Sequence, residues 1–300
     1  MPKTENFQWY VEQVADGEIH GHALTATLAQ GRSSFQAYAI VVSPLFGKML
    51  VLDGDTQSSG MDERIYHEAL VHPAFSAFGR PRRALILGGA EGASLREALR
   101  WPSIAQVTMV DIDRDVVDAC RTHMPEWSGG AFDDGRAELI VGDAKAYVES
   151  AAERFDVIIG DLTEPLADSP SYGLHTESFY RRIRQRLSPS GVYALQASMA
   201  GPHNFATHAR MIATLRAAFP SVAPYATYVP AFDTEWGFAL CGAAVDPLGG
   251  DGAAKADELC ASMKLAHYDG QTHRRMFNLP KYLRDAYASE TRIYTEFGAE

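Results

Sequence analysis

The chain has 300 residues, of which 46% are hydrophobic and 22% charged, so it can form one large domain with a sizeable core and a smaller second domain. Its formal net charge of −11 argues against nucleic acid as the main partner, because binding phosphates requires clustered Lys and Arg side chains. No apolar targeting segment and no run of about eighteen apolar residues occurs, so we expect a cytoplasmic protein without a membrane span.

The hydrophobic pattern changes near His72. Before it, short runs alternate apolar and polar residues, which is typical of antiparallel strands. After it, strands alternate with helical segments, which predicts βαβ units and a parallel sheet. We therefore expect a small N-terminal antiparallel β domain over residues 1–72 and a doubly wound, Rossmann-like α/β domain over residues 73–300. The predicted strands are residues 22–28, 35–43 and 48–52, followed by 84–87, 106–110, 137–141, 155–160, 191–197, 221–229 and 236–241.

A glycine-rich turn, Gly88-Gly89-Ala90-Glu91-Gly92, follows the first strand of the larger domain and precedes a helix. Glycines let the backbone approach a ligand closely, and the free N–H groups of the helix suit a nucleotide-like group. Glu91 would repel a pyrophosphate or an amino acid carboxylate but attract a cationic amine. The turn therefore predicts a nucleoside ligand with a positive tail. A NAD-dependent oxidoreductase is disfavoured, because the GxGxxG spacing is missing.

Acidic residues also end the next two predicted strands. Asp111 is placed to accept hydrogen bonds from ribose hydroxyls, although it could instead cap the helix that begins near Arg114. Asp143, with Ala144 beside it, could accept a hydrogen bond from an adenine amino group or cap its own helix. The carboxyl ends of parallel strands meet at one edge of the sheet, so both carboxylates are candidates for the same nucleoside site.

The strand at residues 155–160 is followed by Asp161 and Glu164. With Glu91, Asp111 and Asp143 these make five carboxylates at one edge of the sheet, a self-repulsive group that requires cations among its members. A metal ion is the weaker option, because nothing in the sequence resembles a phosphate cradle. A cationic amine substrate fits better. The alternative for Asp161 is a turn former before Pro165.

These motifs, in their order and spacing, resemble the polyamine aminopropyltransferases, the spermidine synthase family. The glycine turn and the region around residues 160–165 are most similar to the thermospermine synthase and bacterial triamine or agmatine branch. The resemblance covers most of the chain. The segments that carry it are residues 50–54, Gln57, Tyr66-His67-Glu68, residues 71–73, 88–92, 110–113, 132–134, 142–144, Asp161, residues 179–180, Tyr268, His273 and residues 279–280.

The resemblance implies a fold like that of class I methyltransferases and transfer of an aminopropyl group from decarboxylated S-adenosylmethionine to an amine such as putrescine, agmatine or spermidine, with release of 5'-methylthioadenosine. Decarboxylated S-adenosylmethionine is then a co-substrate, and neither a further cofactor nor a metal is expected. The carboxylate of Glu91 would hold the propylamine nitrogen and reject the carboxylated parent compound. The implied donor-binding residues are Gln36, Gln57, Gly88, Gly89, Glu91, Asp111, Asp143 and Ala144.

For the reaction, Asp161 is the candidate that orients the attacking amine and removes its proton, with Tyr66 beside it. His67, Glu164 and Phe232 are the candidates for amine binding; Phe232 stands where relatives commonly have tyrosine. Tyr66 and His67 could instead be ordinary residues of one helix face.

Two other functions stay open. An S-adenosylmethionine-dependent methyltransferase would have the same fold, and a non-catalytic polyamine-binding protein would keep the carboxylates. The exposed edges of the small sheet predict self-association, and the resemblance implies that it gives a homodimer or homotetramer. Residues 166–174 are a candidate lid over the pocket.

Overall fold

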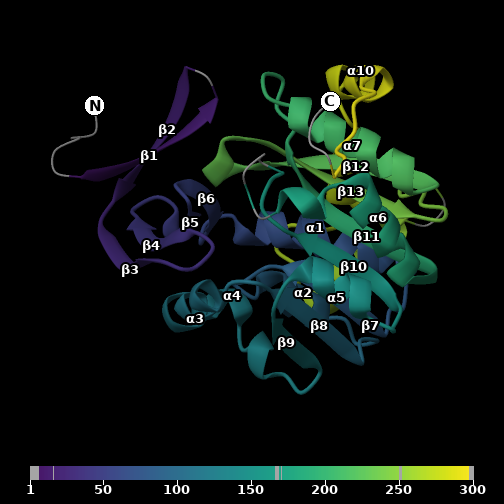
Figure 1. Cartoon of the computed structure of the whole chain (residues 1–300), viewed down its shortest axis with the longest axis horizontal. Helices are drawn as coiled ribbons and strands as arrows, with labels where there is room; N and C mark the ends of the chain where they lie inside the picture. The colour runs from purple at the N-terminus through teal and green to yellow at the C-terminus, as the bar shows by residue number, and fades with distance from the viewer. Residues whose placement is uncertain (1–6, 16, 166–168, 170, 250–251, 297–300) are drawn as a thin grey trace.

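The structure is a computed structural model of the chain and describes residues 7–15, 17–165, 169, 171–249 and 252–296. A small all-β part lies beside a larger α/β part (Figure 1). Of the predicted lid at residues 166–174, residues 166–168 and 170 lie outside the described residues. No described helix is both long enough and apolar enough to cross a membrane.

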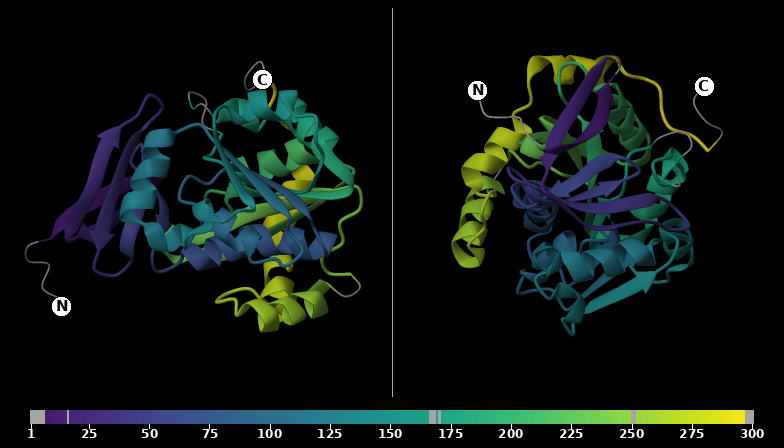
Figure 2. Two further views of the ribbon diagram at one scale, coloured as in Figure 1. Left: turned by 90° about the horizontal axis from the view of Figure 1, so that it is seen from below. Right: turned by 90° about the vertical axis from the view of Figure 1, so that its left-hand side faces the viewer.

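The N-terminal part consists of a hairpin and a four-stranded sheet, both antiparallel. The hairpin lies next to the four-stranded sheet (Figures 1 and 2), and its Glu18 lies 3.4 Å from His203 of the larger part. The sheet has the order β3-β4-β5-β6 and buries Ile40, Met49 and Leu50. The strands are β1 (Gln8–Ala15), β2 (Glu18–Leu24), β3 (Ala26–Arg32), β4 (Ala37–Ser43), β5 (Gly47–Leu52) and β6 (Asp55–Ser59).

The larger part is built on a seven-stranded sheet with the order β12-β13-β11-β10-β7-β8-β9. The neighbours from β9 to β11 run parallel, and β13 runs antiparallel to both β11 and β12. After β7, strands β8 and β9 are added on one side of β7, and β10 is then added on the other side. The strands are β7 (Arg83–Gly88), β8 (Gln106–Asp111), β9 (Ala137–Val141), β10 (Phe155–Asp161), β11 (Leu187–Met199), β12 (Ser221–Val229) and β13 (Thr234–Gly242).

Helices cover both faces of this sheet. Alternate residues of β7 point to opposite faces, so Ile86 packs in the core with α1 and α2, and Leu87 packs in the other core with α6 and α7. Helix α3 contacts β3 and β4 of the N-terminal sheet. The helices are α1 (Glu63–Phe78), α2 (Ala93–Leu99), α3 (Arg114–His123), α4 (Pro125–Ser128), α5 (Ala144–Ser150), α6 (Glu177–Arg186), α7 (Ala206–Ala218), α8 (Gly252–Met263), α9 (Gly270–Phe277) and α10 (Lys281–Ser289).

The expected α/β class, with a doubly wound sheet and a small N-terminal antiparallel β part, is confirmed. The predicted strand at residues 22–28 is wrong in detail, because β2 ends at Leu24 and β3 begins at Ala26. The division at residue 72 stays a prediction; helix α1 runs from Glu63 to Phe78 across that point. The strand order reverses between β7 and β10, so a crevice is expected outside the carboxyl ends of these two strands.

Candidate active site

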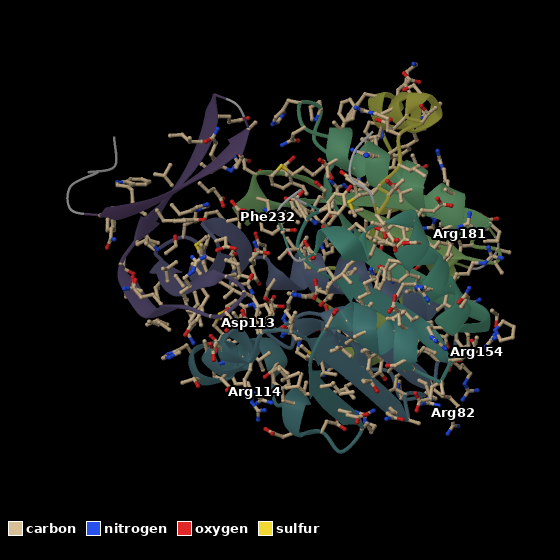
Figure 3. The ribbon with its side chains drawn as sticks, in the orientation of Figure 1. Arg82, Asp113, Arg114, Arg154, Arg181 and Phe232 are labelled. Carbon is tan, nitrogen blue, oxygen red and sulfur yellow. The ribbon has the colours of Figure 1, made fainter. Side chains whose placement is uncertain are left out.

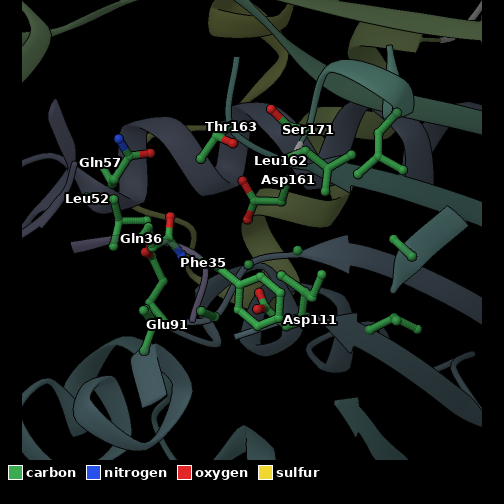
Figure 4. A pocket seen from close by; sticks show the side chains of 18 of the residues that line it. Phe35, Gln36, Leu52, Gln57, Glu91, Asp111, Asp161, Leu162, Thr163 and Ser171 are labelled. Carbon is green, nitrogen blue, oxygen red and sulfur yellow. The ribbon is translucent and has the colours of Figure 1, made fainter. Parts of the chain in front are cut away.

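Two adjoining cavities lie at this edge of the sheet, between the two parts of the chain. The first, of about 160 Å³, is lined by the ends of β7, β8 and β10 and is shown in Figure 4. The second, of about 350 Å³, extends toward β6 and Phe232. No described residue that lines either cavity is Lys, Arg or His. The residues common to both walls are Phe35, Gln36, Leu52, Gln57, Tyr66, Leu162 and Thr163.

The predicted glycine turn lines the first cavity, and its glycines are required by a close approach of two strands. Gly88 and Gly89 both have φ of +80°, which disfavours any residue with a side chain. A Cβ atom on Gly88 would lie 2.1 Å from the backbone oxygen of Asp161, and one on Gly89 would lie 3.0 Å from its Oδ2. These glycines therefore allow the ends of β7 and β10 to meet at Asp161.

Asp161 is the last residue of β10 and faces the first cavity (Figure 4). Its Oδ1 accepts a hydrogen bond from the Tyr66 hydroxyl at 3.0 Å, and its Oδ2 accepts one from Ser94 Oγ at 2.7 Å. Burial and the charge of Asp161 hold the pKa of Tyr66 well above its ordinary value, so the phenol stays protonated and donates. Tyr66 lines both cavities, so this pair stands where they meet.

Glu91 lines the first cavity and is only 8% exposed. Its Oε1 pairs with His67 Nε2 at 2.9 Å, and Nδ1 on the other side of that ring hydrogen-bonds the Glu63 backbone oxygen at 2.6 Å. Burial disfavours a charged imidazole, but Glu63 and Glu91 outweigh it and raise the pKa of His67 to about 10. His67 lines neither cavity; it lies behind Glu91 as a buried imidazolium.

The charges continue behind His67 into the interior. Glu63 Oε2 lies 2.7 Å from the guanidinium of Arg96, whose Nε lies 2.8 Å from Glu97. Glu97 is fully buried and also pairs with His72 at 3.0 Å. Acids and bases thus alternate from the interior to the wall of the cavity, which compensates most of the charge that Glu91 would otherwise bury alone.

Asp111 ends β8 and lines the first cavity, but it does not cap the following helix. The cap is Asp113, whose side chain accepts hydrogen bonds from Asp115 and Val116, while Asp111 Oδ1 accepts one from the Asp113 backbone at 2.8 Å. Asp143 caps α5 through the Lys145 N–H, which was one of its two interpretations. It also lines the cavity next to Ala144, and its contact with an adenine stays a prediction.

The carboxyl group of Asp111 is harder to ionise in the folded chain than in water. Burial raises its pKa to about 6; the hydrogen bond from Asp113 opposes the shift and the charges of Asp113 and Asp161 add to it. Ionising it therefore costs more in the folded chain than in the unfolded one, where the pKa is ordinary. This cost is complete above pH 6 and disappears as the pH falls toward 4.

Asp111→Asn should consequently raise the free energy of unfolding of the ligand-free protein by about 2–3 kcal/mol near pH 7.5. This gain in stability should shrink steadily as the pH is lowered to 5, because Asp111 of the folded wild-type protein then becomes protonated and neutral. Urea unfolding at both pH values measures the difference. A variant less stable than wild type at pH 7.5 would contradict this account.

Gln36 and Gln57, both predicted to contact the donor, line both cavities. Gln36 lies in the turn between β3 and β4, and its Nε2 donates to Asp113 Oδ2 at 3.0 Å. Gln57 lies in β6. In Figure 4, Gln36, Gln57 and Glu91 stand on one side of the cavity and Asp161 on the other. The N-terminal sheet thus supplies part of the wall that the α/β part cannot supply.

Glu164 and Phe232 line the second cavity, opposite the N-terminal strands. The Ser198 hydroxyl donates to Glu164 Oε1, and burial nevertheless raises the pKa of this carboxyl above its ordinary value. The Phe232 ring packs on Trp236 at 4.6 Å between centroids and edge-on to Tyr66 at 6.3 Å. Figure 3 labels Phe232 and Asp113 on the side of the α/β part that faces the N-terminal sheet, far from Arg82, Arg154 and Arg181.

Several residues of the site escaped the sequence reasoning. Ser94 holds Asp161, Phe35 forms part of the wall of both cavities, and Asp55 adds a carboxylate to the second cavity. Ser94 follows the glycine turn closely, which is a usable signal. Phe35 and Asp55 belong to the other sheet, and no local pattern indicates that they reach this cavity. Among the described residues, no group of three or more His, Cys, Asp or Glu could hold a metal ion.

Known proteins are similar to this chain over nearly its whole length. Residues 63–246 match the spermine/spermidine synthase domain, and residues 8–59 match the spermidine synthase tetramerisation domain. A polyamine aminopropyltransferase of Synechococcus sp. (strain JA-2-3B'a(2-13)) is 42% identical, over 98% of this chain and 97% of its own length. One from Sulfolobus acidocaldarius is 40% identical, over 96% and 95%.

Solved structures agree with these relatives. A spermidine synthase in complex with the transition-state analogue AdoDATO superimposes with a TM-score of 0.86 at 26% identity, and the Thermotoga maritima spermidine synthase with 0.85 at 25%. Each comparison covers 97% of this chain and 97% of the other. The family expected from the motifs is therefore confirmed: the chain belongs to the spermine/spermidine synthase family.

Proposed function

We propose that this chain transfers the aminopropyl group of decarboxylated S-adenosylmethionine to an amine and releases 5'-methylthioadenosine. The chain is an aminopropyltransferase, as its relatives at about 40% identity over nearly their whole length are named. The observation that best supports the reaction is Glu91. It puts a carboxylate into the glycine turn of a cavity that no described basic side chain lines, where a cationic propylamine is favoured and a carboxylated ligand is not.

The first cavity is proposed to hold the donor. Asp111 would accept hydrogen bonds from the ribose hydroxyls, and Asp143 with Ala144 would contact the adenine. Gly88 and Gly89 give the close backbone approach, while Gln36 and Gln57 would contact the nucleoside and its methylthio side. Glu91 would bind the terminal ammonium, with His67 acting through Glu91 rather than on the substrate. The co-substrate supplies the group transferred, so no metal is assigned.

The second cavity is proposed to hold the acceptor amine. It is lined by Glu164, by further carboxylates of the N-terminal strands and by aromatic rings, which together suit a chain of methylenes carrying ammonium groups. Glu164 would bind one such group, and Phe232 would pack on the methylenes. Putrescine, agmatine, spermidine and related polyamines all have this chemistry, so the acceptor is one of this class.

Asp161 stands where the two substrates would meet, and its role follows from the reaction. The attacking amine must lose its proton to become a nucleophile, and a carboxylate orients the nitrogen and accepts that proton. The nitrogen then forms a bond to the carbon next to the sulfonium while the carbon–sulfur bond breaks and its electron pair stays on sulfur as the thioether. Sulfonium is already a good leaving group, so positioning provides much of the acceleration. Tyr66 holds Asp161 in place.

Product analysis by mass spectrometry tests the function directly. The protein is incubated with decarboxylated S-adenosylmethionine or with S-adenosylmethionine, each with putrescine, cadaverine, agmatine, spermidine and related triamines. We expect an aminopropylated amine and methylthioadenosine with the decarboxylated donor alone. A methylated product from S-adenosylmethionine would instead identify a methyltransferase. Binding of amines without any product would identify a polyamine-binding protein.

Glu91→Gln should raise KM for the decarboxylated donor by roughly 10- to 100-fold, the effect of losing one charge-assisted hydrogen bond. It should also reduce the preference for that donor over S-adenosylmethionine, because the carboxylate that repels the parent compound is gone. Steady-state kinetics with each donor measure both effects. Glu126→Gln, at an exposed ion pair with Lys48, is the control. Unchanged KM with unchanged preference would remove Glu91 from the donor site.

The N-terminal part is proposed to assemble copies of the chain into a homotetramer, as the name of its matching family model suggests. Trp9, Val11 and Ile19 of the hairpin are 51%, 51% and 67% exposed, which is unusual for large apolar side chains on one small element. Light scattering coupled to size exclusion should give the mass of four chains. A dimer would support a smaller assembly through the same part, and a monomer would contradict the proposal.

A further inference from the structure

The turn that joins β3 to β4 carries residues of the N-terminal sheet into the first cavity. Ser33 closes this turn: its N–H donates to the Gln36 oxygen at 2.9 Å, and its Oγ accepts from the N–H groups of Phe35 at 3.0 Å and Gln36 at 3.1 Å. Phe35 and Gln36 then line both cavities, although Phe35 is 40% exposed. The position of this turn relative to the α/β part is therefore important for the cavity.

One residue of the α/β part holds the turn from the other side. Asp113 is 1% exposed and uses its two oxygens differently. Oδ1 accepts from the backbone of Asp115 and Val116 and caps α3. Oδ2 accepts from Ser33 Oγ at 2.6 Å and from Gln36 Nε2 at 3.0 Å, across the boundary between the two parts of the chain. A charged acceptor makes both of these bonds strong and sensitive to direction.

The contact also fixes which way the Gln36 amide points. An ionised carboxylate accepts hydrogen bonds and donates none, so the NH₂ end of Gln36 must face Asp113. The carbonyl oxygen Oε1 is then the end left for the cavity, where it can accept a hydrogen bond from a hydroxyl or amino group of a ligand. Without this partner the two ends of the amide would be interchangeable.

Asp113 reaches the other wall of the cavity as well. Its N–H donates to Asp111 Oδ1 at 2.8 Å, which holds that carboxylate and leaves Oδ2 for a ligand. We infer that Asp113 and Ser33 form a latch between the two parts of the chain, and that the latch positions Gln36 and Asp111 on the nucleoside of the donor. The inference rests on the proposed donor site. Asp113 and Ser33 are positioning residues, which act through their neighbours.

Two variants test the latch at its two ends. Asp113→Asn keeps a good helix cap, because Asn caps helices as well as Asp does, but it offers an NH₂ group to Gln36 and turns the glutamine amide around. Ser33→Ala removes the donor on the other side and leaves α3 untouched. Each should raise KM for decarboxylated S-adenosylmethionine, and Kd for methylthioadenosine measured by calorimetry, by about tenfold. KM for the amine and kcat should change less than about twofold.

The controls separate positioning from general damage. Asp115→Asn removes a charge from the exposed first turn of the same helix without touching the latch and should behave as wild type. Ser33→Thr keeps the hydroxyl and should restore much of the donor affinity. A rise in both KM values together with a lower melting temperature would reduce Asp113 and Ser33 to structural residues. The latch would also be overturned if Asp113→Asn and Ser33→Ala had the same KM for the donor as Asp115→Asn.

The same measurements distinguish a failed latch from a failed function. If wild-type protein neither binds methylthioadenosine nor forms an aminopropylated product, the proposed donor site itself is wrong. If wild type does both and the variants match it, only the latch is wrong. Binding of methylthioadenosine needs no acceptor amine, so this readout does not depend on knowing the preferred acceptor.

Discussion

Replacing Asp161 by Asn is expected to lower kcat by about 10²–10⁴-fold, the usual contribution of a positioned general base. An amide has nearly the same shape as the carboxylate and can still accept the hydrogen bond from Tyr66, but it accepts no proton from the attacking amine. KM for the donor and the midpoint of urea unfolding should therefore stay close to wild type. Rates of methylthioadenosine release at saturating substrates measure the loss.

The neighbours of Asp161 give the controls. Tyr66→Phe should lower kcat by about fivefold, because it removes one hydrogen bond of about 1 kcal/mol and leaves the base. Asp118→Asn, on the exposed side of α3, should have no effect. If Asp161→Asn keeps more than about a third of the wild-type kcat, another group removes the proton and the proposed role is wrong.

Replacing Arg96 by Met is expected to lower the free energy of unfolding by up to about 3–5 kcal/mol, because it removes the cation that lies between two buried carboxylates and leaves them with fewer charged partners. The side chain of Arg96 is 11% exposed and lies between the carboxylates of Glu63 and Glu97, which are 9% and 0% exposed. Its guanidinium also donates to the backbone oxygen of Trp127. Equilibrium unfolding in urea measures the change.

Arg121 provides the matched comparison for this prediction. It pairs with Asp133 at 3.1 Å, but both side chains are exposed to water, by 42% and 78%. Arg121→Met should change the stability by no more than about 0.5 kcal/mol. Equal losses in the two variants would show that burial is not what makes the Arg96 cluster important. Arg96→Lys, which keeps the charge but not the planar fork, should fall between them.

The sequence allowed the parallel part of the sheet to be predicted because those strands are buried on both faces and appear as apolar runs. The predicted strands at residues 106–110 and 155–160 differ from β8 and β10 by only one residue at the carboxyl end, and both of these strands are largely buried. The small sheet was harder. Strand β6, with the sequence Asp55-Thr56-Gln57-Ser58-Ser59, contains no apolar residue, and nothing in residues 22–28 marks the break at Thr25 between β2 and β3.

The candidate site follows the same division. Residues at the ends of β7, β8 and β10 were predictable because topology alone brings strand ends together. The sequence pattern did not predict which side chains contact one another across segments. His67 looked like an amine ligand, yet it lies behind Glu91, because its partner Glu63 is one helical turn away and draws the ring inward. The helix cap proposed as an alternative for Asp111 falls instead to Asp113.

Both parts of the chain line the first cavity, so ligand binding there is coupled to the arrangement of the two parts. A donor held in the first cavity would touch Gln36 of the N-terminal sheet and Asp111 of the larger sheet at once, so it would favour the relative orientation in which both are reached. By reciprocity, anything that holds the N-terminal sheet in that orientation tightens donor binding by the same factor. Self-association through this sheet would then be a heterotropic effector of the site, rather than a separate property of the protein.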